Sequence, residues 1–125
     1  MRLLLDTHVL LWWLAADPGL SPAARSVIAE GANTVFVSAA TAWEMAIKRA
    51  LGKLIVPDDL EGAVTASGFQ SLPITMAHAL LAGALPRHHD DPFDRMLIAQ
   101  AQSEGLTIVT RDAQFSAYGV PILPS

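Results

Sequence analysis

Residues 91–112 read DPFDRMLIAQAQSEGLTIVTRD, and this stretch carries the local signals that decide the fold. Asp91-Pro92 is typical of a helix start, because aspartate caps helices and proline favours the first helical position. Gly105 stands where such a helix would end. The apolar segment Leu106–Val109 then predicts a buried strand. We therefore expect a helix that leads directly into a strand, as in a parallel α/β unit.

The same alternation extends through the rest of the chain. Leu3–Leu5 is a continuous apolar run, typical of a strand buried on both faces, and Thr34–Ser38 predicts a second strand. A weaker strand is expected at residues 69–74, and a last strand at residues 120–123. Helices are expected at residues 8–15, 22–30, 39–51, 57–68 and 75–85, with a short helical turn at 112–118. Because strands and helices alternate, we predict a mainly parallel sheet with helices on both faces, in a single domain spanning residues 1–125.

Composition excludes several classes of protein. The chain has 125 residues, of which 52% are hydrophobic and 16% charged, and this excludes intrinsic disorder. The absence of cysteine excludes a disulfide scaffold, a zinc–thiolate site and a cysteine nucleophile. A net charge of −4 argues against a bulk basic face that grips nucleic acid. Asp6 and His8 interrupt the first apolar run, and no stretch offers the ~20 apolar residues of a membrane span, so we predict a cytoplasmic protein.

Acidic residues follow or flank the ends of the predicted strands. Asp6 comes directly after the first strand, Glu44 lies in the helix after the second, Asp94 opens the helix before the fourth, and Asp112 follows that strand. In an open parallel sheet the functional crevice lies beyond the carboxyl ends of the strands. We therefore expect these four side chains to meet at one edge of the sheet.

Each acid also has a simpler structural interpretation. Asp6 could cap the first helix, and Asp112 could belong to a turn. Glu44 stands four residues before Lys48, a spacing typical of a solvent-facing ion pair. Asp91 before Pro92 is explained by helix capping alone, and an acid in the first turn, as at Asp94, suits the helix dipole. Each interpretation is sufficient for its own residue. The placement of four acids at the same edge of the sheet nevertheless favours a functional site.

Crowded carboxylates resist ionisation unless a cation lies between them. Mg²⁺ and Mn²⁺ suit oxygen ligands and keep several bound waters, so either ion is the predicted cofactor. Without the four acids the net charge would be −4 + 4 = 0, so bound metal would invert the sign of the site and attract an anionic chain locally.

Three stretches together resemble a PIN-domain ribonuclease, and in particular the VapC toxins of bacterial type II toxin–antitoxin pairs. They are LLLDTHVLLWWL at the start, Ser38 with Trp43-Glu44 in the middle, and residues 91–112 near the end. The resemblance covers essentially the whole chain in order. It implies a compact three-layer α/β/α sandwich that cleaves RNA phosphodiester bonds through in-line attack by a metal-activated water, leaving a 5′-phosphate and a 3′-hydroxyl.

The resemblance also implies roles for individual residues. Asp6 and Asp94 would be metal ligands, with Glu44 and Asp112 completing the catalytic cluster directly or through water. Residues expected near the substrate are the hydroxyls Thr7, Ser38 and Thr110 and the cations Arg95 and Arg111. The expected partners are an RNA substrate (tRNA, rRNA or mRNA), a VapB-like antitoxin and a second copy of the chain.

The remaining aromatic and histidine residues receive weaker interpretations. Trp12 and Trp13 lie on a helix that is apolar all round, and we expect them at a protein contact. His8 is expected beside Asp6 at best, His78 as an ordinary helix residue, and His88 and His89 as loop residues rather than ligands.

Two other functions stay open on sequence alone. One is a non-catalytic interaction module that keeps the fold and its binding surface. The other is a small phosphohydrolase with Asp6 as covalent nucleophile, although such chemistry usually needs a second acid where this chain has His8.

Overall fold

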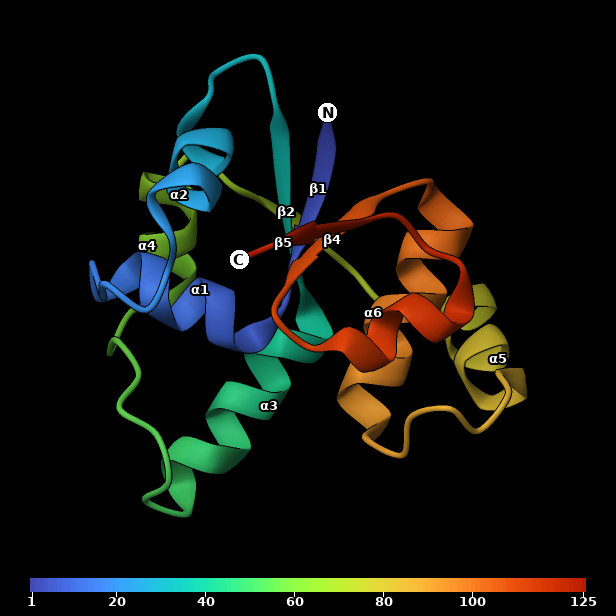
Figure 1. Cartoon of the computed structure of the whole chain (residues 1–125). Coiled ribbons are helices and arrows are strands. Elements are labelled where there is room, and N and C mark those ends of the chain that lie inside the picture. The colour runs from blue at the N-terminus through green and yellow to red at the C-terminus, as the bar shows by residue number, and fades with distance from the viewer.

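The structure, a computed structural model, describes residues 1–125 and alternates strands with helices along most of its length (Figure 1). The strands are β1 (Arg2–Leu5), β2 (Thr34–Ser38), β3 (Gln70–Leu72), β4 (Thr107–Thr110) and β5 (Ile122–Pro124). The helices are α1 (Thr7–Leu14), α2 (Pro22–Ala29), α3 (Ala39–Ala50), α4 (Leu60–Ala66), α5 (Met76–Ala84) and α6 (Pro92–Glu104), followed by the 3₁₀ helix η1 (Ala113–Tyr118). All of the predicted elements are present.

The local signals place most helix ends within a residue or two. Asp91 caps α6, and Gly105 follows it in the left-handed conformation with φ of 68°, which glycine adopts at little cost. One start is wrong: α4 begins at Leu60 rather than at residue 57. The reason is that Asp59 is the N-cap, and its side chain accepts a hydrogen bond of 2.9 Å from the Gly62 N–H.

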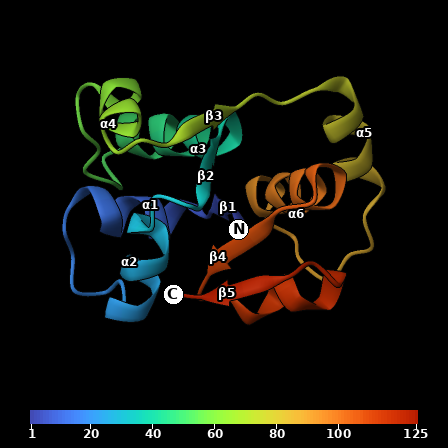
Figure 2. The same ribbon diagram turned by 90° about the horizontal axis from the view of Figure 1, so that it is seen from above.

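The sheet has five strands in the order β3-β2-β1-β4-β5, and every neighbouring pair is parallel. Seen from above, α1, α2 and α4 lie on one side of this sheet and α5, α6 and η1 on the other (Figure 2). The predicted parallel sheet with helices on both faces, a three-layer α/β/α sandwich, is confirmed. None of the helices combines the length and the apolar character needed to span a bilayer.

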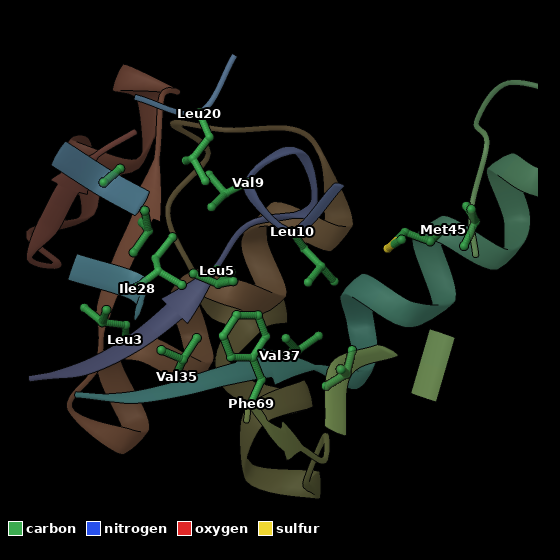
Figure 3. Packing of buried hydrophobic residues seen from close by; sticks show 14 residues of the cluster. Leu3, Leu5, Val9, Leu10, Leu20, Ile28, Val35, Val37, Met45 and Phe69 are labelled. Atoms are coloured by element: carbon green, nitrogen blue, oxygen red, sulfur yellow. The ribbon is translucent and has the colours of Figure 1, made fainter. Parts of the chain in front are cut away.

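Strand β1 anchors both hydrophobic cores, because successive side chains of a strand point to opposite faces. Leu3 and Leu5 belong to the cluster under α1 and α2, which Figure 3 shows with Val35 and Val37 of β2. Leu4 belongs to the second cluster, under α5 and α6. All three leucines are fully buried, and each contributes about 1.5–3 kcal/mol to stability by its removal from water.

The strand order creates the position at which a site is expected. From β1 the chain adds β2 and β3 on one side of the sheet, then crosses over to place β4 and β5 on the other. The order therefore reverses between β1 and β4. In open α/β sheets ligands bind beyond the carboxyl ends of the strands at such a switch point.

Candidate active site

A cavity of about 350 Å³ lies at this switch point. It is surrounded by the segments that leave β1, β2 and β4, and Figure 1 shows the starts of α1 and α3 close together at this end of the sheet. Five acidic side chains line it, together with two cations and three other residues. The lining residues are Asp6, Thr7, His8, Trp12, Glu44, Lys48, Asp91, Asp94, Arg111 and Asp112. The structure thus brings together the four acids that the sequence places at the sheet edge.

Asp6 lies at the end of β1 and is 7% exposed. It caps α1, since its Oδ1 accepts a hydrogen bond of 2.9 Å from the Val9 N–H. Its Oδ2 accepts a bond of 2.6 Å from the Thr110 hydroxyl at the end of β4. Burial raises the pKa of Asp6, and these hydrogen bonds oppose the rise only in part. Asp6 is therefore both a helix cap and a member of the acidic cluster.

Glu44 is buried, although its spacing from Lys48 is typical of a surface pair. The Thr7 hydroxyl donates to Glu44 Oε1 at 2.5 Å, and Lys48 Nζ donates to Oε2 at 2.7 Å. The hydrogen bond to Glu44 raises the pKa of Lys48. The solvent-facing interpretation is wrong because α3 contacts α1 and α6, and this packing turns Glu44 inward.

Asp91 and Asp94 lie at the start of α6. Asp91 Oδ1 accepts bonds of 2.8 and 3.1 Å from the N–H groups of Phe93 and Asp94, so the capping role that the sequence predicts is present. Burial, followed by the negative charge of Asp91, raises the pKa of Asp94 to about 7, and His89 opposes this rise. Asp91 and Asp94, three residues apart at the start of α6, both line the cavity.

Asp112 and His89 complete the cluster from the other side. Asp112 caps η1 by accepting from the Gln114 N–H at 2.9 Å, and its own N–H donates to the Thr110 hydroxyl at 3.0 Å. His89 Nε2 lies 3.0 Å from Asp94 Oδ2 and 3.1 Å from Asp112 Oδ2. His89 does lie in a loop, as predicted, but its contacts with Asp94 and Asp112 were not expected from the sequence. The one feature of the sequence that could have indicated them is that His89 stands two residues before Asp91, the cap of α6.

Two of the expected substrate-side residues lie elsewhere. Ser38 is buried outside the cavity, where its hydroxyl accepts a bond of 3.0 Å from the Ala40 N–H and caps α3. Arg95 also lies outside the cavity, because its guanidinium donates at 2.8–3.3 Å to four backbone carbonyls at the end of α5 and in the loop that follows, those of Ala82, Leu85, Pro86 and His89. In this structure Ser38 therefore caps a helix, and Arg95 binds backbone carbonyls; neither side chain faces the acidic cluster.

Arg111 does line the cavity, and contacts outside the acidic cluster fix its guanidinium in place. Its guanidinium donates to the carbonyls of Gly19 and Ser125 and lies 4.4 Å from the centre of the Trp12 ring, a cation–π distance. Thr7 and Thr110 are the two expected hydroxyls that contact acids of the cluster, since Thr7 donates to Glu44 and Thr110 donates to Asp6.

The tryptophan prediction needs correction. Trp12 and Trp13 are half-buried, and Trp13 packs on Phe69 while its Nε1 donates to Ser67 Oγ at 3.1 Å. Trp43 of α3 is instead 63% exposed and packs edge-on against Phe93. Trp12 and Trp13 pack against the first core cluster and are not among the large exposed apolar side chains, so α1 offers no exposed tryptophan patch.

His78 is also more than an ordinary helix residue. It is 1% exposed, its Nδ1 accepts from the Thr75 N–H at 3.1 Å, and its Nε2 lies 2.9 Å from Glu104 Oε1. It thereby joins the start of α5 to the end of α6. His8 is exposed at the cavity rim, and His88 is exposed with its ring against Tyr118.

The donor set of the cavity suits a divalent ion. Carboxylate oxygens from four separate segments converge, and the raised pKa values of Asp6 and Asp94 reflect burial together with the charge of neighbouring acids. Hard oxygen donors of this kind favour Mg²⁺ or Mn²⁺. A cation between them would offset the repulsion that raises the pKa of Asp94.

The raised pKa of Asp94 predicts the pH dependence of stability in EDTA. Between its unfolded value of 3.8 and about 7, the folded protein binds a proton that the unfolded chain has lost. Stability should therefore fall as pH rises through this window. We expect Asp94 to account for about 1–2 kcal/mol of that loss, since solvent screens a partly exposed carboxyl. Urea unfolding at pH 5 and pH 8 measures it, and Asp94→Asn should show a smaller fall. An equal fall in both proteins would contradict the assignment.

Comparison with known proteins gives concordant results. The family model described as PIN domain matches residues 3–121. Ribonuclease VapC22 of Mycobacterium tuberculosis is 33% identical over 121 residues, which cover 94% of this chain and 92% of that protein. The fold is shared with VapBC2 from Rickettsia felis bound to a promoter DNA fragment, with a TM-score of 0.73, 15% identity and coverage of 99% and 98% of the two chains. DNA-bound VapBC from Salmonella typhimurium is similar, with a TM-score of 0.71, 19% identity and the same coverage.

Proposed function

The chain belongs to the PIN domain family, and we propose that it is a metal-dependent endoribonuclease that acts as the toxin of a toxin–antitoxin pair. The observation that carries the proposal is the meeting of Asp6, Glu44, Asp94 and Asp112 in one cavity at the switch point of the sheet. The match to a ribonuclease over nearly the whole chain supports RNA as substrate.

Asp6 and Asp94 would hold Mg²⁺ or Mn²⁺, with Glu44 and Asp112 contributing directly or through water. A bound ion of this kind lowers the pKa of its water and neutralises charge that develops on a phosphate. The protein's own part is to fix the carboxylates in advance. Val9 and Thr110 fix Asp6, while Thr7 and Lys48 hold the two oxygens of Glu44. Such preorganisation removes the cost of arranging these groups during the reaction.

Cations at the cavity suit an anionic substrate. Lys48 and Arg111 both line it beside the acids, and Arg111 is fixed by its carbonyl contacts and by Trp12. We expect them to attract the RNA backbone while the acids act on the bond that is cut. The cleaved RNA (tRNA, rRNA or mRNA) would carry a 5′-phosphate and a 3′-hydroxyl at the cut.

The proposed partners are a VapB-like antitoxin and a second copy of the chain. The fold is shared with chains of VapBC complexes, which supports an antitoxin. Large exposed apolar side chains on α3, directly after it and on α5 supply a surface for protein contact, namely Trp43, Leu51, Met76 and Leu80. Because both RNA and antitoxin are intracellular, the proposed site of action is the cytoplasm.

The direct test is RNA cleavage with and without a divalent ion. Purified protein with total RNA and Mg²⁺ or Mn²⁺ should produce discrete fragments, and EDTA should abolish them. Asp94→Asn should lower the cleavage rate by about 100-fold or more, since it removes a metal-holding charge. Asp90→Asn is the matched control, because Asp90 is an exposed acid in the loop directly before α6 and lies outside the cavity. Cleavage that persists in EDTA, or an unaffected Asp94→Asn protein, would overturn the proposal.

A further inference from the structure

His89 contacts the acidic cluster in a way that none of the other histidines does. It lies on the loop between α5 and α6, and its side chain is 10% exposed. Its Nε2 lies within hydrogen-bond distance of one oxygen of Asp94, at 3.0 Å, and one of Asp112, at 3.1 Å. These acids come from α6 and from the segment after β4, so one ring atom connects two parts of the site.

The second ring nitrogen determines what Nε2 can do. His89 Nδ1 accepts a hydrogen bond of 3.2 Å from the Asp91 N–H. A ring nitrogen that accepts carries no hydrogen, so in the neutral imidazole the hydrogen is on Nε2. Nε2 is therefore a donor shared by the two carboxylates. Phe115 lies edge-on to the ring at 5.7 Å and closes one side of it.

This arrangement differs from that of a histidine that binds metal. A ligating histidine offers a bare nitrogen to the ion and donates its other N–H to an acceptor. Here Nδ1 faces a backbone donor, and the nitrogen nearest the acids holds the hydrogen. The distances among His89, Asp94 and Asp112 would permit a three-ligand metal group, but the hydrogen-bond pattern favours donation over ligation.

We propose that His89 is a positioning residue, which holds Asp94 and Asp112 together through one shared N–H and so preorganises them for a divalent ion. The inference rests on the proposed metal-dependent function. It assigns a part in the site to a loop residue outside the four acids. Because groups that hydrogen-bond to metal ligands tune the affinity for the ion, the predicted effect appears first in ion binding.

The test is calorimetric titration of the full chain with Mn²⁺ at constant pH. His89→Ala should weaken Mn²⁺ affinity by about 10- to 100-fold, the range found for partners of metal ligands. His89→Gln, which keeps an N–H donor of similar reach, should recover most of that loss. His88→Ala is the matched control and should match the wild type, because the exposed His88 ring lies against Tyr118. Thermal unfolding of each variant checks that the fold is retained.

Two further readouts separate positioning from ligation and from a purely structural role. Electron spin-echo spectroscopy of the Mn²⁺-loaded wild type should show no directly bound nitrogen, and a bound nitrogen would overturn the proposal. Unchanged Mn²⁺ affinity in His89→Ala, or a Gln variant as weak as Ala, would also overturn it. A wild type that binds no Mn²⁺ or Mg²⁺ at all would instead refute the proposed function, so the two failures are distinguishable.

Discussion

Asp6→Asn is expected to lower RNA cleavage by about 10³-fold or more while leaving the fold intact. The substitution removes one of the two carboxylates proposed to hold the ion, and losing several kcal/mol of transition-state stabilisation corresponds to such a factor. The amide can keep both structural contacts of Asp6. Its oxygen can still accept from the Val9 N–H, and its NH₂ can donate to the Thr110 hydroxyl oxygen, which already accepts from Asp112. Initial rates on a short RNA at saturating Mg²⁺ measure the effect.

Asp17→Asn is the matched control for Asp6→Asn. Asp17 follows the other end of α1, where its Oδ1 accepts from the Gly19 N–H at 2.7 Å, and it does not line the cavity. We expect this variant to cleave at close to the wild-type rate. If Asp6→Asn also cleaves at that rate with an unchanged melting temperature, Asp6 has no role in the reaction and serves only as a helix cap.

Arg95→Ala is expected to be the most destabilising of the proposed substitutions, by about 2–4 kcal/mol. The guanidinium satisfies carbonyls at the end of α5 and in the loop that leads to α6, and hydrogen bonds to a charged group contribute about 1.5–3 kcal/mol each when they are not replaced by water. Because Arg95 is only half-buried, water will satisfy some of these carbonyls. Urea denaturation gives the free energy of unfolding directly.

Arg95→Lys and Arg87→Ala are the variants to compare with Arg95→Ala, because they show whether its loss of stability comes from the guanidinium contacts. An ammonium group has one nitrogen where the guanidinium uses two, so lysine should recover little of the stability. Arg87 is an exposed cation of the same loop, and Arg87→Ala should change stability by less than about 0.5 kcal/mol. A stable Arg95→Ala protein with impaired RNA binding would show instead that Arg95 acts on substrate.

Local signals were sufficient for the elements and for the placement of the four acids. Helix α6 is bounded by an aspartate–proline start and a glycine end, which depend on backbone chemistry within a few residues. The continuous leucines of β1 indicated a strand buried on both faces, as in a parallel sheet, and all three are buried. The carboxyl ends of parallel strands share an edge, so acids that follow those strands, or that open the helix leading into one, were expected to meet there. Asp6, Glu44, Asp94 and Asp112 do so.

Tertiary packing decided the contacts that each side chain makes. Glu44 has the spacing of a surface ion pair and is buried only because α3 packs against α1 and α6. The guanidinium of Arg95 reaches its carbonyls, and the imidazole of His89 reaches Asp94 and Asp112, because of how α5 and α6 pack and how the loop between them runs. The sequence alone determined which chemical groups reach the edge of the sheet, since strand ends and helix caps are set by neighbouring residues. Which groups touch there depends on distances between segments far apart in the chain, and only the folded structure fixes those distances.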